Sequence, residues 1–229
     1  MKRKIFVPLM ATISLLASCG ETRPLRSDIQ EFIASFSIKE ARKEYLESNY
    51  IRTDLYHEPD QEIKTIMEVS FNIKDQKNAT YEYTYRKYVD DVLDTENSRH
   101  TEIHKGESGY IVNKDGVEST ITYEELDQNY VRHFFYRTDV ADVHSIGMYM
   151  ADVLREKLPY IQDYVTVDFE AKTLTYEVPF GVEKNVEGYD FNEILVVNSL
   201  GMLVSFDNKI MSSTGVITVE SNLVVTNII

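Results

Sequence analysis

The chain has 229 residues, of which 43% are hydrophobic and 27% are charged, and its formal net charge at pH 7 is −14. This acidic balance repels the phosphates of nucleic acids, which excludes nucleic acid as an expected partner. The sequence contains one cysteine, so an intramolecular disulfide cannot contribute to stability and the fold has to rest on its hydrophobic core.

The N-terminus has the pattern of an export signal. Three basic residues, Lys2 to Lys4, precede a mostly apolar run from Ile5 to Leu16. The run is shorter than the roughly 20 residues that a membrane-spanning helix needs. It ends in Leu16-Ala17-Ser18-Cys19, which resembles the lipobox of bacterial lipoproteins. The resemblance implies that residues 1–18 are a signal peptide removed before Cys19, and that acyl chains on Cys19 anchor the protein in the membrane.

The rest of the chain is expected to be one acidic domain on a short tether. Without residues 1–18 it keeps 21 basic against 38 acidic side chains, a net charge of −17. We expect residues 19–27 to be the lipidated cysteine and a polar tether. We expect residues 28–229 to form a single domain at the extracytoplasmic face of the cell membrane. The sequence lacks phosphate-binding glycine loops and dinucleotide fingerprints, so no cofactor is expected.

Two helices are expected to open the domain. Asp28 can cap the first helix, and Ser37-Ile38-Lys39-Glu40 matches a capping box that would begin a second helix ending near Ser48. From Ile63 the hydrophobic period becomes two, which predicts strands. Lys114-Asp115-Gly116 predicts the turn of a later hairpin.

A helical pair then interrupts the predicted strands. Thr122-Tyr123-Glu124-Glu125 matches a second capping box, which predicts a helix to about Phe135. An apolar stripe from Val140 to Leu158 predicts another helix, beginning at Asp139 and stopping at Pro159.

Strands resume at Val165 and continue to the C-terminus. The segment from Pro179 to Asp190 is interpreted as a long loop. We expect this loop to lie at the mouth of any ligand cavity, because it is long and Gly181 and Gly188 are flexible points.

The order of elements predicts an α+β fold. It consists of a curved antiparallel sheet of nine or ten strands packed on N-terminal and inserted helices. The chain resembles the half-barrel lipoproteins typified by the periplasmic lipoprotein carrier and the lipid-binding lipoproteins of mycobacteria. The resemblance lies in the order of elements, in the lipobox and in hairpins such as residues 109–116. The resemblance implies a half-barrel whose cavity, between sheet and helices, accepts acyl chains.

Five residues are candidates for the lining of such a cavity. Tyr81, Tyr83 and Tyr85 share one strand face, and Met150 and Leu154 belong to the second inserted helix. An ordinary core explains the same pattern, since aromatic rows are typical of half-buried strands and apolar stripes of helix-on-sheet packing. An apolar cavity at these residues would indicate a carrier, and close packing would indicate an interaction protein.

His100, Glu102 and His104 share one face of a predicted strand, and imidazole and carboxylate groups are zinc ligands. At about 3.3 Å per residue, positions 100 and 104 stand roughly 13 Å apart, so only one neighbouring pair, such as His100 and Glu102, could bind one ion. A solvated strand face explains the pattern better.

These patterns favour a membrane-anchored lipoprotein that binds a hydrophobic or amphipathic ligand, plausibly a lipid. The alternative is a non-catalytic envelope protein with a solid core and a protein partner that the sequence does not identify. A metal-dependent hydrolase comes third, because no catalytic motif is present.

Overall fold

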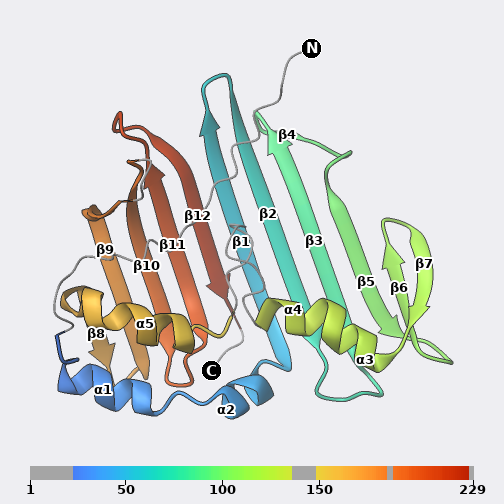
Figure 1. Cartoon of the computed structure of the whole chain (residues 1–229). Coiled ribbons are helices and arrows are strands. Elements are labelled where there is room, and N and C mark those ends of the chain that lie inside the picture. The colour runs from blue at the N-terminus through green and yellow to red at the C-terminus, as the bar shows by residue number, and fades with distance from the viewer. Residues whose placement is uncertain (1–22, 136–147, 185–187, 227–229) are drawn as a thin grey trace.

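The computed structural model describes residues 23–135, 148–184 and 188–226 (Figure 1). Within these ranges, twelve strands form one open sheet. The strands of the first half are β1 (Glu47–Glu58), β2 (Gln61–Asn72), β3 (Thr80–Val89), β4 (Val92–Leu93), β5 (Arg99–Lys105), β6 (Tyr110–Lys114) and β7 (Val117–Ile121). Those of the second half are β8 (Val165–Asp168), β9 (Thr173–Lys184), β10 (Asp190–Asn198), β11 (Leu203–Met211) and β12 (Ile217–Val225).

The sheet consists of two meanders joined at the centre. Its order is β7-β6-β5-β3-β2-β1-β12-β11-β10-β9-β8, with β4 paired to β3, and every pair is antiparallel. Strands β1 and β12 pair from Tyr50 opposite Val225 to Tyr56 opposite Val219. The first and the last strand of the chain therefore lie side by side in the middle of the sheet.

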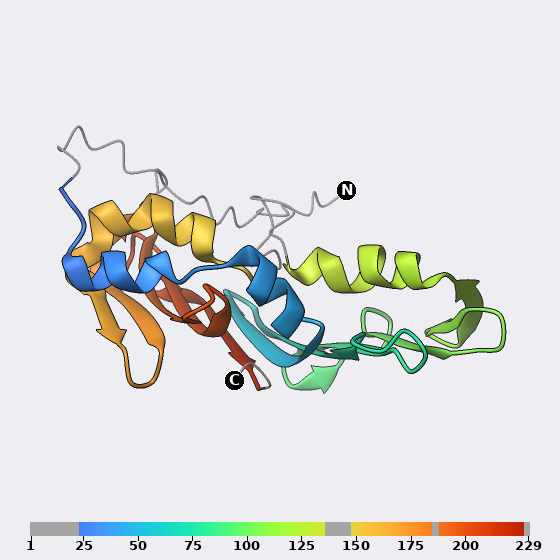
Figure 2. The same ribbon diagram turned by 90° about the horizontal axis from the view of Figure 1, so that it is seen from below.

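The helices form a layer on one side of the curved sheet (Figure 2). They are α1 (Ser27–Ala34), α2 (Ile38–Glu44), α3 (Tyr123–Leu126), the π-helix η1 (Asp127–Val131), α4 (Arg132–Phe135), α5 (Ala151–Ile161) and the 3-10 turn η2 (Gln162–Tyr164). We call the helix-bearing side the inner face and the other side the outer face. On the inner face Phe71 of β2 packs against Tyr45, which follows α2, with ring centroids 5.0 Å apart.

The α+β class and the curved, open, antiparallel sheet are confirmed, but nine or ten strands is too few. Strand β1 was not predicted, because its inward positions include the polar residues Ser48, Arg52 and Asp54 and so lack an apolar alternation. Strand β4, which has two residues, was not predicted either.

The predicted helix ends were partly wrong. The first helix begins at Ser27 rather than after an Asp28 cap, and Asp28 instead pairs with Arg26 at 2.5 Å in the first turn. The second helix ends at Glu44, because the chain enters β1 at Glu47. The expected stop at Pro159 lies inside α5, where a missing N–H removes one bond from the last turn and leaves the helix intact.

The Thr122 capping box is confirmed, with both reciprocal bonds present. The helix that it begins continues through η1 and α4 to Phe135, as predicted. The predicted start of the next helix at Asp139, and its stripe before residue 148, lie outside the described residues.

The expected loop from Pro179 to Asp190 is wrong in its first part, since β9 continues to Lys184. The register against β10 shifts between Phe191 and Glu193, so the strand bulges around Gly181. The backbone N–H of Gly181, at φ +92°, donates to the buried Asp190 carboxylate at 2.8 and 3.0 Å, which fixes the bulge in place.

Candidate functional site

A row of polar side chains crosses the inner face at the centre of the sheet. Cross-strand pairing places one residue from each of six neighbouring strands in line, which we call the polar row: Lys87 (β3), Thr65 (β2), Asp54 (β1), Ser221 (β12), Asn208 (β11) and Glu193 (β10). Its four central members, from Thr65 to Asn208, are each at most 9% exposed. Buried polar side chains in this number and alignment are unusual in a sheet core.

Apolar side chains flank the polar row on both sides. Along the strands toward the helices, the next inward residues in register belong to the main hydrophobic core: Met67, Leu223, Phe206, Leu195 and Tyr176. Along the strands away from the helices, Val219 and Ile210 are 3% and 2% exposed but are not part of that core cluster. The polar row therefore separates the main core from a second buried apolar strip.

Arg52 lies beside the polar row on β1 and is 1% exposed. Its Nε donates to both carboxylate oxygens of Asp54, at 3.0 and 2.9 Å, and the Thr65 hydroxyl lies 3.5 Å from the same carboxylate. Nη2 of Arg52 makes no hydrogen bond with any described residue. The pair is neutral as a whole, yet its cation keeps an unused donor.

Two other buried atoms of the polar row share this property. Among the described residues, neither Oγ of Ser221 nor Oδ1 of Asn208 has a hydrogen-bond partner. Ser221 lies directly opposite Asp54, and Asn208 is next to Ser221 on β11. Since buried polar atoms in proteins are nearly always hydrogen-bonded, three such atoms at one place indicate a site that can bind a polar group.

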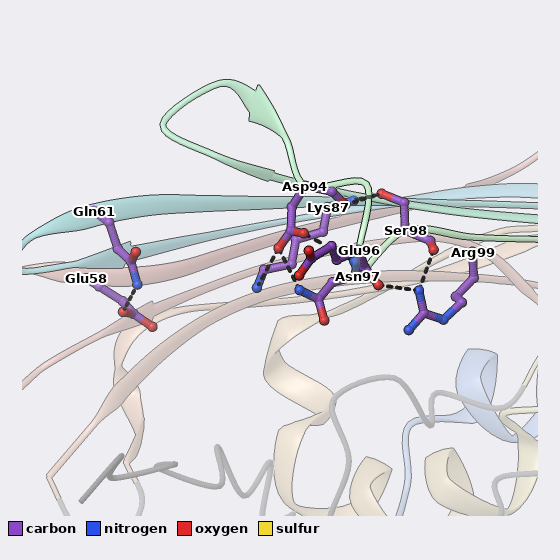
Figure 3. Close-up of polar contacts among 8 residues, drawn as sticks. All are labelled: Glu58, Gln61, Lys87, Asp94, Glu96, Asn97, Ser98 and Arg99. Atoms are coloured by element: carbon purple, nitrogen blue, oxygen red, sulfur yellow. Dashed lines mark hydrogen bonds and ion pairs between the residues drawn. The ribbon is translucent and has the colours of Figure 1, made fainter. Parts of the chain in front are cut away.

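The charged residues at the two ends of the polar row, Glu193 and Lys87, each form an ion pair. Nζ of Lys157 in α5 lies 3.5 Å from Oε1 of Glu193, and Nζ of Lys87 lies 3.5 Å from Oδ2 of Asp94. Figure 3 shows Asp94 between Lys87 and Asn97, on the side of the sheet where the helices lie. Hydrogen bonds from Asn97, together with the charge of Lys87, hold the pKa of Asp94 below its ordinary value.

Two of the predicted cavity residues lie next to this site. Tyr85 is opposite Met67, which is opposite Arg52, and Tyr83 is two positions along the same face. Both side chains are half-buried. Burial raises the pKa of Tyr83 to about 12, and burial together with the charge of Asp54 raises the pKa of Tyr85. Both hydroxyls therefore stay protonated at neutral pH and can donate hydrogen bonds.

The other three predicted cavity residues are closely packed. Tyr81 is 4% exposed, and its ring meets that of Tyr130 in η1 with centroids 5.3 Å apart. Met150 and Leu154 are 8% and 1% exposed, and the Met150 N–H donates to the Gly201 carbonyl in the β10–β11 turn. Since β2, β1 and β12 lie between β3 and β11, the five residues do not line one place.

The weak metal candidates lie on the outer face. His100 and Glu102 are exposed on β5, and Nδ1 of His100 is 3.1 Å from the Thr84 hydroxyl. Among the described residues, no three His, Cys, Asp or Glu side chains are close enough to hold a metal ion. The pair therefore has no third ligand in this part of the chain.

The sequence matches no protein-family model, and it has no significant match among curated proteins. Cys19 and the lipobox lie outside the described residues. Across the described residues, none of the helices has the length and apolar character required to cross a membrane.

Sequence reasoning missed Arg52, Asp54, Ser221 and Asn208. A signal for the first two was present, because Pro59-Asp60 is a turn dipeptide, and a turn before the strand at Ile63 implies a preceding partner strand. A partner strand that runs back from that turn carries both residues on one face.

Proposed function

We propose that the protein is a bacterial lipoprotein, anchored through Cys19 at the extracytoplasmic face of the cell membrane, which binds an amphipathic ligand on the inner face of its sheet. The observation that carries this proposal is the polar row with its unused hydrogen-bonding atoms, set between two buried apolar strips. A ligand with a polar group between two apolar portions matches this arrangement, in which the polar row lies between two apolar strips. The likeness to half-barrel lipid-binding lipoproteins is part of the same proposal.

A second candidate is a non-catalytic envelope protein with a solid core. The close packing of Tyr81, Met150 and Leu154 favours it, since these side chains pack against their own helices and strands. It does not explain the buried Nη2 of Arg52, since a buried donor that makes no hydrogen bond lowers the stability of the folded state. For that reason we place ligand binding first.

Native mass spectrometry tests ligand binding. The full chain carrying Cys19→Ala, which removes the acylation site, is purified without detergent and incubated with a membrane lipid extract. We expect one bound lipid per chain, released on denaturation. A clean apo mass after incubation would remove ligand binding from first place and favour the solid-core protein.

The anchor is tested separately by the intact mass of the parent chain extracted from membranes. We expect the loss of residues 1–18 and the mass of acyl chains on Cys19, whereas the Cys19→Ala chain carries no acyl mass. An unmodified Cys19 in the parent chain would contradict the anchor and leave ligand binding untouched.

A further inference from the structure

Among the described residues, the cations around the polar row lie beside carboxylates. Arg52 pairs with Asp54, Lys87 with Asp94 and Lys157 with Glu193, so each of these three cations already faces a carboxylate. An anionic group placed against Arg52 would add an uncompensated negative charge beside the buried Asp54, inside a chain that is acidic overall. A neutral acceptor would satisfy Nη2 without adding charge.

We infer that the polar group of the ligand is a neutral acceptor oxygen, the carbonyl of an acyl ester, which accepts a hydrogen bond from Nη2 of Arg52. This inference rests on the proposed function and names its ligand class. The hydroxyl of Ser221 is the second donor, because it lies on the adjacent strand, one residue pair from Arg52 on the same face, and a carbonyl oxygen can accept two bonds.

The apolar strips favour an ester over a peptide. An acyl ester has one carbonyl and no N–H, so its chains match the apolar character of the residues on both sides of the polar row, Met67 and Leu223 on one side and Val219 and Ile210 on the other. A peptide would bring an N–H at nearly every residue, each needing an acceptor on these apolar strips.

Three probes with the same tail separate the possibilities: methyl laurate has a neutral carbonyl, laurate an anionic one, and dodecane none. Each is titrated into the full chain carrying Cys19→Ala. Because the bond from a buried guanidinium is charge-assisted, we expect methyl laurate to bind about tenfold tighter than dodecane. We expect laurate to bind no tighter than the ester.

Two variants assign the carbonyl site. Arg52→Met with Asp54→Leu removes both charges together, and we expect it to abolish the preference for the ester while dodecane still binds. Ser221→Ala is the milder variant and should weaken ester binding about fivefold. Ser70→Ala is its matched control, since Ser70 is exposed on the outer face of β2, and we expect no change.

Each other result has a separate meaning. Tighter binding of laurate than of methyl laurate would overturn the neutral acceptor in favour of an anion. Equal binding of all three probes would overturn the inference and leave the proposed function standing. Binding of an acetylated leucine dipeptide amide in place of every probe would overturn both in favour of a peptide ligand, and binding of none of these compounds would overturn both outright.

Discussion

Arg52 and Asp54 are two positions apart on β1, so their side chains leave the strand on the same face and can pair without help from another element. Both are buried, and burying a cation and an anion costs free energy that their attraction only partly offsets. A buried pair of this kind adds little net stability. Under the proposed function, Arg52 has a second role as a hydrogen-bond donor to the ligand.

Removing one partner at a time measures this balance. We expect Arg52→Met to lower the free energy of unfolding by about 3 kcal/mol or more, because it leaves the Asp54 carboxylate buried without a cation. The double variant Arg52→Met with Asp54→Leu should recover most of that loss. Urea unfolding of the full chain provides the measurement, and a double variant less stable than the single one would show that the pair itself stabilises the fold.

At the scale of elements, the helix starts differ in how completely they are capped. Thr122 and Glu125 form the full capping box, in which the backbone N–H of Thr122 donates to the Glu125 carboxylate at 2.7 Å. These bonds from Thr122 lower the pKa of Glu125. Ser37, which matches the same sequence pattern, accepts only one bond, from the Glu40 N–H at 3.4 Å.

We therefore expect Thr122→Ala to cost about 1 kcal/mol and Ser37→Ala clearly less, by urea unfolding of the full chain. The pKa of Glu125 is lowered in the folded state, so its contribution is present above the ordinary glutamate pKa and is lost as the pH falls through the lowered value. The difference between the parent chain and Thr122→Ala should shrink on acidification. Equal losses at Thr122 and Ser37 would show that the reciprocal bond has no effect.

Elements with a regular apolar period could be predicted from the sequence, and those with polar inward positions could not. The hairpin at Asp115-Gly116 was predictable because both residues adopt positive φ, as the turn requires. Strand β1 was not, because Arg52 and Asp54 occupy positions that an ordinary strand gives to apolar residues. The polar residues that prevented the prediction of β1 belong to the candidate site. Functional sites are where local sequence rules are expected to fail.

At the scale of the whole molecule, the helix layer is joined to the sheet at Gly201. Its carbonyl accepts from the Met150 N–H at the start of α5. A Cβ added at Gly201 would lie 2.9 Å from Cβ of Ala151 and 3.1 Å from the ring of Phe36. The β10–β11 turn, α5 and the segment after α1 therefore meet with no room for a side chain.

Gly201→Ala should consequently destabilise the protein by about 3 kcal/mol, from the positive φ of +80° and from overpacking together. Gly215 is the matched control, because it has the same φ of +80° and nothing within 4 Å of an added Cβ. Gly215→Ala should cost about 1 kcal/mol. Thermal or urea unfolding compares them, and equal losses would mean that the junction at Gly201 can relax.

The pairing of β1 with β12 fixes the order in which the molecule can be completed. Residues near position 50 leave the ribosome long before their partners near position 225, so one edge of β1 stays open while the other strands are being made. The two meanders can form separately, but the chain cannot join them until its last strand arrives. If the N-terminus leads the chain across a membrane, the centre of the sheet closes only on the far side.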